Sequence, residues 1–273
     1  MVIDSISFIG GGVMAEAMIQ GLLAKGLVSA DHVTASDPRK KRQEELHHLC
    51  GIRVTGDNVL AARAGEIVVF AVKPQVLGNV LQELKGALEP RQMVMSIVAG
   101  ARIDTMRETL CHDAIVRVMP NTPAQIGQGI SVWTATEGFS EERLDQARAI
   151  LQALGKEIYM DDEKFLDMAT AVSGTGPMYV FLVMEAMIDA AVHLGFPRHI
   201  AYELVAETMR GSIAYAIQSG KHPAELRNLV TSPGGTSAEA LYQLEKGSLR
   251  TVLSKAVWAA YERSKYLGGS VGR

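Results

Sequence analysis

The sequence predicts an α/β protein in which an N-terminal Rossmann-type doubly wound sheet is followed by an all-α domain. A glycine-rich turn, GGGVMA at 10–15, lies between a strand pattern and a helix pattern near the N-terminus. Short apolar runs then alternate with helical segments as far as about residue 160. Beyond Asp161 we find only helical patterns. We therefore expect two domains, 1–160 and 161–273.

Six segments of the first domain have the pattern of strands. They lie at 2–9, 32–36, 66–72, 93–100, 114–120 and 129–135. Several, such as EIVVFAV at 66–72, are apolar nearly throughout, which is typical of parallel strands buried on both faces. A helix is expected over 12–25, and Pro38 suits the first turn of a second, polar helix. This alternation predicts a parallel sheet with helices on both faces.

The second domain reads as five helices. They are expected at 164–194, 198–219, 223–230, 236–246 and 248–267. The stretch 176–194 is apolar nearly all round but carries Glu185 and Asp189, so we do not expect it to cross a membrane. Five helices in about 110 residues can hardly enclose such a helix, because a single small domain has too little interior. We therefore expect it to be buried against a partner subunit, as a dimerisation domain.

The composition is that of a soluble globular protein, with 48% hydrophobic and 21% charged residues and a net charge of -3 over 273 residues. This charge gives no support to nucleic-acid or membrane binding. The seven histidines show no metal-ligand spacing, so no metal site is expected. The N-terminal segment lacks the basic region of a signal peptide, and we expect a cytoplasmic protein. Cys50 and Cys111 are expected to be buried thiols.

The glycine-rich turn has the spacing of a dinucleotide-binding loop, Gly-x-Gly-x-x-Ala. Gly10 allows the tight turn, and Gly12 lets a pyrophosphate approach the backbone. Ala15 is small enough for the helix to pack closely on the strand. The motif alone is weak, but here it occupies the first strand–helix turn of an alternating pattern. A turn that is merely tight is the alternative.

The residues at the end of the second expected strand bear on whether the cofactor is NAD or NADP. Asp37 lies where an acidic residue would hold the ribose 2′-hydroxyl of NAD. Ser36 and Arg39 can instead hold the 2′-phosphate of NADP, and this is the interpretation we favour. Lys41 and Arg42 are expected on a solvated helix face.

Three further loops follow strand ends, at 71–75 (AVKPQ), 96–100 (SIVAG) and 117–123 (RVMPNTP). Ligands on such sheets bind beyond the carboxyl ends of the strands. Asn121 can offer hydrogen bonds there. Lys73 is a candidate catalytic group, but a lysine that ends a buried strand more often reaches solvent.

A second glycine loop, SPGGTS at 232–237, leads into the helix expected at 236–246. Thr236 and Ser237 have the character of N-caps. A loop aimed at a helix N-terminus is a ready site for an anion. The chain therefore carries two expected anion sites, more than 200 residues apart.

FIGGGVMAEA, AVKPQ, RVMPNTP, SGTGPMY (173–179) and SPGGTS together resemble pyrroline-5-carboxylate reductase, over about residues 6–267. The resemblance implies reduction of 1-pyrroline-5-carboxylate to L-proline with NADPH or NADH, the last step of proline biosynthesis. It implies a Rossmann domain followed by a helical domain that joins two subunits, with assembly into larger rings such as a decamer. The carboxylate of the substrate is then the anion of the second loop, and the cofactor pyrophosphate is that of the first.

The resemblance also implies functional residues. Those expected at the cofactor are Gly10, Gly11, Gly12, Val13, Met14, Ser36, Arg39, Asn58, Ala71, Val72, Lys73, Pro74, Ala99, Gly100 and Asn121. Those expected at the substrate are Thr175, Ser232, Gly234, Gly235, Thr236 and Ser237. Thr236 and Ser237 are the catalytic candidates, through hydrogen bonds to the ring nitrogen. The family often has a polar residue in place of Val13 and a threonine in place of Ser237; valine keeps the backbone N–H groups, and serine keeps the hydroxyl.

Two other functions are weighed. A 3-hydroxyacid dehydrogenase shares the plan but commonly needs a lysine base on the first long helix of its second domain, and residues 174–197 contain no lysine. A sensor of NADP or proline that lacks turnover is the alternative outside enzymes. The motifs leave open the size of the oligomer, the preference for NADPH or NADH, the proton donor and feedback by proline.

Overall fold

The computed structural model describes residues 3–270. They form two compact units, each described here by itself. The first comprises the described residues up to Thr175 together with those from Ala259 onward. The second comprises Gly176–Trp258. The first unit therefore contains both an N-terminal part of the chain and the last turns of its final helix.

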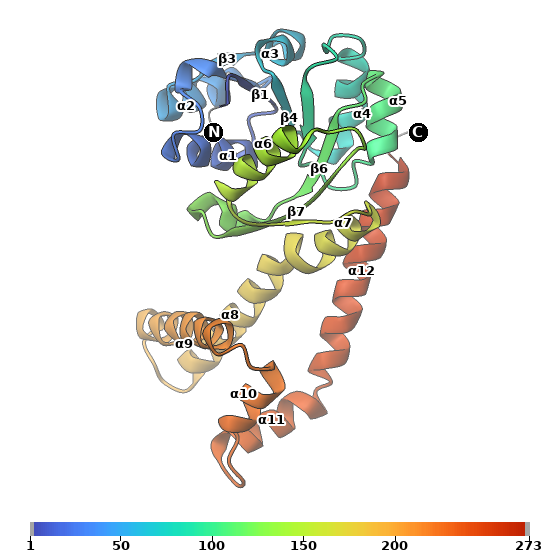
Figure 1. The fold of residues 1–273 in the computed structure, drawn as a ribbon. Helices are drawn as coiled ribbons and strands as arrows, with labels where there is room; N and C mark the ends of the chain where they lie inside the picture. The colour runs from blue at the N-terminus through green and yellow to red at the C-terminus, as the bar shows by residue number, and fades with distance from the viewer. Residues whose placement is uncertain (1–2, 271–273) are drawn as a thin grey trace. The chain divides into compact units, whose positions relative to one another are not determined.

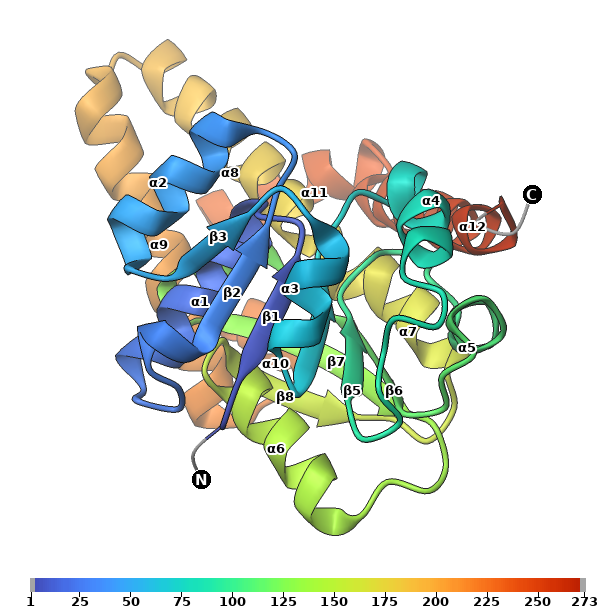
Figure 2. The ribbon, with the colours of Figure 1, turned by 90° about the horizontal axis from the view of Figure 1, so that it is seen from above.

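The first unit is built on one mixed sheet, which has eight strands within the described residues, in the order β3-β2-β1-β4-β5-β6-β7-β8 (Figures 1 and 2). The strands are β1 (Ile6–Ile9), β2 (Val33–Ser36), β3 (Arg53–Thr55), β4 (Ile67–Phe70), β5 (Met93–Ser96), β6 (Ile115–Met119), β7 (Gly129–Ala135) and β8 (Gly155–Tyr159). Neighbouring strands from β3 to β6 run parallel, and the order reverses between β1 and β4. The predicted Rossmann-type sheet is confirmed.

The far edge of the sheet departs from the prediction of a wholly parallel arrangement. β7 runs antiparallel to β6, and β8 is parallel to β7. Residues 120–128 form only a short connection that includes the 3₁₀ helix η2 (Thr122–Ile126). A parallel pair needs a longer crossover, so this connection turns the chain back on itself.

Two strands were missed by the sequence patterns. β3 has three residues at the edge of the sheet, none of them buried, so it lacks an apolar run. β8 reads GKEIY and has no buried residue either. Both edge strands are held by backbone pairing with a neighbour rather than by an apolar face.

Helices cover both faces of the sheet. α1 (Val13–Ala24), α2 (Lys40–Cys50) and α6 (Glu141–Gln152) contribute to one apolar core, which includes Phe8 and Trp133. α3 (Asn58–Ala64), α4 (Pro74–Glu83) and α5 (Ile103–Leu110) contribute to the other, which includes Ile9 and Phe70. Phe8 and Ile9 are neighbours on β1 and point to opposite faces, as side chains of a strand buried on both sides must. This is the doubly wound arrangement.

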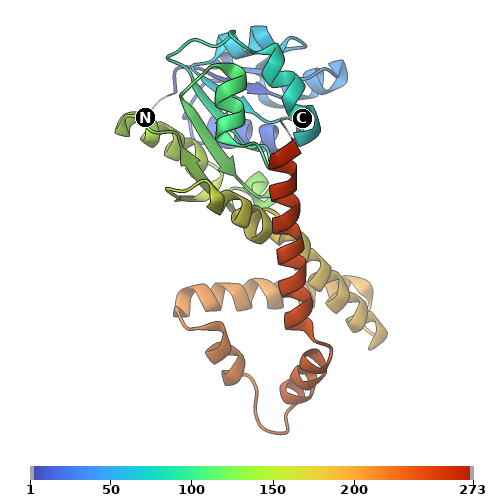
Figure 3. The same cartoon turned by 90° about the vertical axis from the view of Figure 1, so that its right-hand side faces the viewer.

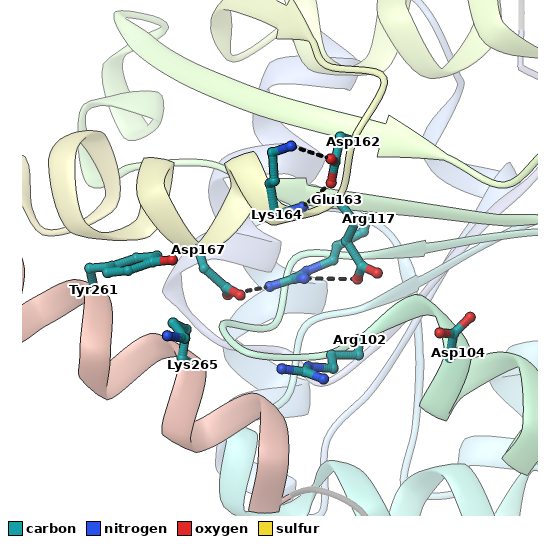
Figure 4. A pocket seen from close by; sticks show the side chains of 9 residues that line it. All are labelled: Arg102, Asp104, Arg117, Asp162, Glu163, Lys164, Asp167, Tyr261 and Lys265. Atoms are coloured by element: carbon teal, nitrogen blue, oxygen red, sulfur yellow. Dashed lines mark hydrogen bonds and ion pairs between the residues drawn. The ribbon is translucent and has the colours of Figure 1, made fainter.

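A buried ionic network joins three distant parts of the first unit (Figure 4). Arg117 on β6 donates to Glu163 Oε1 at 2.8 Å and to Asp167 Oδ1 at 2.9 Å, with a side chain only 4% exposed. Asp167 lies on α7 (Lys164–Ala169). Ser264 on α12 (Leu249–Ser270) donates to the same Asp167 oxygen at 2.9 Å. The network thus fixes α7 and the end of α12 to the sheet.

The helix expected over 164–194 is interrupted. α7 ends at Ala169 and continues as a π-helix, η3 (Thr170–Gly174), before α8 (Gly176–His193) begins. Three hydroxyl groups bond back to carbonyls in this segment, among them Ser173 Oγ to Ala169 O at 2.9 Å and Thr175 Oγ1 to Thr170 O at 2.9 Å. π-helices of this length occur often at functional sites.

The second unit consists of helices: α8, α9 (Arg198–Ser219), α10 (Pro223–Leu229), α11 (Thr236–Lys246) and the first part of α12. Its apolar core contains only Ile188, Ala201 and Val205 as buried residues. Many large apolar side chains are exposed instead, including Phe181 at 61% and Leu182 at 60%. Among the described residues, one helical stretch, Lys164–His193, has the length and composition to cross a membrane, with a mean hydropathy of 1.4.

The two cysteines are less buried than expected. Cys50 is half-buried, and Cys111 is exposed. The prediction of a buried thiol was wrong for Cys111 because this residue ends α5 in a left-handed conformation, with φ 54°.

Replacing Arg117 by Met should lower the free energy of unfolding by about 3 kcal/mol, because Asp167 would remain buried without its cation. Urea unfolding followed by circular dichroism measures this change. The matched control is Arg107→Met, since Arg107 pairs with Asp113 at 2.7 Å on an exposed surface. That substitution should cost less than about 1 kcal/mol. Equal losses in the two variants would contradict the importance given to burial.

Candidate cofactor and substrate sites

The turn between β1 and α1 requires glycine for measurable reasons. Gly10 has φ +101°, and a Cβ there would lie 2.8 Å from Ala71 O. A Cβ on Gly11 would lie 2.7 Å from Leu46 Cδ1. Gly12 is different, because its Cβ would meet only Ala71 O, at 3.8 Å. The turn is therefore packed tightly against the protein at its first two glycines and open at the third.

The N-terminus of α1 is available to an anion. The helix begins at Val13 after Gly12, and no side chain caps it. Val13 is 62% exposed, while Ala15 is fully buried and lets the helix lie close to the sheet. The N–H groups of a first turn have no partner within the helix, and the helix dipole adds positive potential there. This end of α1 has the properties of a pyrophosphate site.

Asp37, directly after β2, is bound to the glycine turn. Its buried carboxylate accepts hydrogen bonds from Gly11 N at 3.3 Å and from Arg39 N at 3.0 Å. The Arg39 guanidinium adds a two-point contact, Nε to Oδ1 at 2.9 Å and Nη2 to Oδ2 at 3.1 Å. Burial raises the pKa of Asp37, but the hydrogen bonds and charge of Arg39 outweigh burial, and the net pKa lies below its usual value.

Arg39 remains accessible while it pairs with Asp37. Its side chain is 68% exposed, and this contact uses only part of its five N–H donors. Arg39 neutralises the negative charge of Asp37. The pair therefore removes the repulsion that an isolated aspartate would impose on a phosphate.

The Ser36 hydroxyl is engaged inside the protein. It donates to Asn58 Oδ1 at 2.7 Å, and Ser36 is 1% exposed. The Asn58 amide in turn donates to Glu83 Oε2 at 2.8 Å. The structure brings the predicted residues Ser36 and Asn58 together, next to Asp37, but with each other as partners. A contact of Ser36 with a 2′-phosphate stays a prediction that requires this pair to rearrange.

Arg42 was misassigned by the sequence analysis. It does not lie on a solvated face: its Nε donates to Gly11 O at 2.6 Å, and it forms ion pairs with Glu16 on α1 and Glu45 on α2. Arg42 therefore fastens the glycine turn to both helices. The sequence shows that a charged residue occurs at this position of the helix. It does not show these contacts, because they depend on how α2 packs beside α1.

The loops after β4, β5 and β6 lie at the same edge of the sheet as the glycine turn, because these strands run parallel to β1. Ala71 and Val72 pack directly against Gly10. Lys73 is exposed and precedes Pro74 at the start of α4. The Asn121 side chain accepts from Ile130 N at 2.9 Å, so its carbonyl oxygen is used to hold the turn before β7. The loop that holds Ala99 and Gly100 follows β5.

The second glycine loop lies in the other unit. α11 begins at Thr236 with Gly235 as its N-cap, so the prediction that Thr236 or Ser237 caps the helix was wrong. Their side chains lie in the first turn and are exposed. Gly234 has φ +71°, a conformation that favours glycine, and a Cβ there would meet nothing within 4 Å. The loop is open to a ligand on that side.

Gly235, one of the residues expected at the substrate, already uses its backbone N–H within the loop. Gly235 N donates to Ser232 O at 3.0 Å, which closes the turn. The N–H groups of Thr236 and Ser237 belong to the uncapped first turn of α11 and can serve an anion. Thr175, the remaining residue predicted at the substrate, ends the π-helix of the first unit.

Within the described residues, no cluster of three or more His, Cys, Asp or Glu side chains is arranged to hold a metal ion. A run of parallel strands, β3 to β6, with the glycine turn at the point where the strand order reverses defines the class of Rossmann-type dinucleotide-binding proteins.

Comparisons with known proteins narrow this class. Residues 163–267 match the family model described as pyrroline-5-carboxylate reductase dimerisation, and residues 5–100 match one described as coenzyme F420-dependent NADP oxidoreductase. The pyrroline-5-carboxylate reductase of Pisum sativum is 37% identical over 263 residues, covering 96% of each chain. That of Synechocystis is 39% identical over 263 residues, covering 96% of this chain and 98% of its own.

Solved structures agree. The structure of Plasmodium falciparum pyrroline carboxylate reductase with NADP bound has a TM-score of 0.89 at 32% identity, covering 97% of this chain and 98% of that one. This chain belongs to the pyrroline-5-carboxylate reductase family. The resemblance seen in its sequence motifs is confirmed.

Exchanging Arg39 for Glu should weaken NADPH binding about tenfold and NADH binding much less, because the guanidinium that offsets Asp37 and can meet a 2′-phosphate is lost. Fluorescence titration with each cofactor measures both dissociation constants. Lys41→Glu is the control, since it makes the same change of charge at an exposed position nearby. Equal weakening of the two cofactors would place Arg39 away from the phosphate.

Proposed function

We propose that this protein reduces 1-pyrroline-5-carboxylate to L-proline with NADPH, the last step of proline biosynthesis. The observation that carries the proposal is the presence of two uncapped, glycine-led helix N-termini, at α1 and α11, in a member of this family. Each suits one of the two anionic molecules that such a reduction needs.

NADPH is the proposed cofactor, with NADH as the alternative. It supplies the hydride when bound. The open side of Gly12 and the uncapped start of α1 fit a pyrophosphate, and the exposed guanidinium of Arg39 fits a 2′-phosphate. The relative from Plasmodium falciparum binds NADP. We assign the remaining cofactor contacts to Gly11, Met14, Ser36, Asn58 and the loops around Ala71, Gly100 and Asn121.

The substrate is assigned to the loop before α11. Its carboxylate would be held by N–H groups of the first turn of α11 and of Gly234, with help from the helix dipole. The hydroxyl of Ser237 or Thr236 is proposed to hydrogen-bond the ring nitrogen. Ser232 and Thr175 are proposed as further contacts. Since the Thr175 hydroxyl donates to Thr170 O, its oxygen is left as an acceptor.

The reaction adds a hydride to the imine carbon and a proton to the ring nitrogen. The protein has no strong acid among the residues proposed to contact the nitrogen, so water is assigned as the source of the proton. The work of the chain is then positioning. Holding two reactants in line can lower a barrier by roughly 7 to 11 kcal/mol, so the proposed mechanism does not rest on a general acid from the protein.

We infer that the second unit is covered by a second copy of this chain. Its own core holds three buried apolar residues, whereas long stretches of α8 and α9 expose apolar side chains. Monomeric proteins rarely leave such surface in water. The family model matched over 163–267 describes a dimerisation domain, so a partner helix rather than a membrane is the proposed neighbour of α8. Larger rings and a cytoplasmic location are part of the same proposal.

The functional division of the chain follows. Residues 1–160 are proposed to carry the cofactor, and residues 161–273 to carry dimerisation and the substrate loop. A 3-hydroxyacid dehydrogenase is disfavoured because residues 174–197, which include α8, contain no lysine to act as the base. A sensor that binds NADPH without turnover is the remaining alternative, and it is separated by the assay below.

The purified protein should oxidise NADPH when pyrroline-5-carboxylate is added, followed by the loss of absorbance of the reduced nicotinamide, with L-proline as the product by chromatography. NADH is run alongside. Binding of NADPH without oxidation would replace the proposed enzyme by the sensor, and oxidation with another cyclic imine only would change the substrate.

Ser237→Ala should lower kcat about tenfold and leave the dissociation constant of NADPH unchanged, because the lost hydrogen bond is made to the reacting nitrogen. Stopped-flow turnover and cofactor titration measure the two quantities. Ser237→Thr keeps the hydroxyl and should retain activity, which makes it the matched control. A variant that loses cofactor affinity as much as turnover would assign Ser237 to folding instead.

A further inference from the structure

The final turns of α12 belong to the first unit (Figures 1 and 3), where Gly268 contacts the loop that follows β5. The chain leaves this unit after Thr175 and re-enters it at Ala259. Two residues of the returning segment are buried, Ser264 and Gly268. Nothing in the proposed reaction uses this segment.

Ser264 fixes the returning helix. Its hydroxyl donates to Asp167 Oδ1 at 2.9 Å, and Asp167 is held by Arg117 at 2.9 Å. All three side chains are buried, so the contact is shielded from water and is correspondingly strong. The network borders a pocket of about 300 Å³, into which Arg102 and Lys265 also project (Figure 4). These hydrogen bonds therefore fix the position of α12 along the edge of the sheet.

One turn further on, the helix touches the β5 loop backbone to backbone. Gly100 has φ +74°, and a Cβ there would lie 2.9 Å from Gly268 N. Conversely, a Cβ on Gly268 would lie 3.0 Å from Gly100 O and 3.2 Å from Arg102 Nε. Neither chain segment leaves room for a side chain of the other. The loop and this turn of α12 are therefore packed so closely that a shift of one must displace the other.

This loop lies on one side of the point where the strand order reverses. Its first N–H, that of Ile97, donates to Phe70 O at 3.1 Å and ties it to the end of β4. A dinucleotide lies across the reversal between β1 and β4, with its pyrophosphate at the glycine turn. Since Arg39 and Asp37 follow β2, the ribose that carries the 2′-group lies on that side. The nicotinamide half then extends over β4 and β5, toward residues 97–101.

We propose that the C-terminal segment of α12 is a positioning element for the nicotinamide half of the cofactor, acting through the contact of Gly268 with Gly100. The segment touches no ligand itself. It holds the β5 loop in the position that contact with the nicotinamide requires. The hydrogen bonds from Ser264 and Arg117 to Asp167 hold the segment itself. This inference rests on the proposed cofactor site.

Two adjacent glycines of α12 provide a matched pair of variants. Alanine at Gly268 pushes against the β5 loop, whereas a Cβ at Gly269 would meet nothing within 4 Å. Both substitutions gain the same intrinsic helix preference. The full-length protein is titrated with NADPH and with 2′-phospho-ADP-ribose, which lacks the nicotinamide. Gly268→Ala should weaken NADPH about tenfold and leave the fragment unchanged. Gly269→Ala should change neither.

Ser264→Ala supplies a second test that adds no atoms, with the exposed Ser254→Ala on the same helix as its control. It should shift NADPH affinity in the same direction as Gly268→Ala and again spare the fragment. Equal weakening of NADPH and fragment, or identical behaviour of the paired variants, would overturn the inference. If the wild type binds the fragment and NADPH equally well, no nicotinamide contact exists, and the inference falls. Failure of the wild type to bind either ligand would overturn the proposed function itself.

Discussion

The first unit depends on one interaction, the buried ion pairs of Arg117 with Glu163 and Asp167. A guanidinium that is 4% exposed needs acidic partners, and here they are Asp167 on α7 and Glu163, the residue before that helix. Ser264 of α12 joins them through its hydrogen bond to Asp167. The place where the chain leaves the first unit and the place where it returns are thereby fixed to the same strand. Removing Arg117 would leave the buried carboxylate of Asp167 without its cation.

The cofactor edge is built by a similar principle, in which charged groups hold backbone. Asp37 accepts from Gly11 N, and Arg42 donates to Gly11 O, so the turn is held by an anion on one side and a cation on the other. Arg39 then neutralises Asp37. The first two glycines are immobilised by packing, and the third is left open. Such a turn needs little rearrangement to receive a pyrophosphate, which favours binding because ordering has already been achieved.

Much of this organisation could be predicted from the sequence. The glycine turn, six strands and the helical second part follow from spacing and periodicity, and each is present. The features that the sequence did not predict all depend on contacts or connections that leave no periodic pattern. β3 and β8 are held by backbone pairing, the reversal of β7 depends on a short connection, and the contacts of Arg42 and Arg117 form between segments distant in sequence. Periodicity reports which side of an element is apolar but not which charged partner a fold will bring to it.

The discontinuity of the first unit also affects how the protein is made. The β5 loop meets its support only when residues 259–269 have left the ribosome, after all the strands and α1–α11. A nascent chain can form the sheet early, since domains generally fold during synthesis. Yet the loop at Gly100 lacks its contact with Gly268, and Asp167 lacks the hydrogen bond from Ser264, until α12 has formed. The first unit is therefore completed only after residues 259–269 have been synthesised.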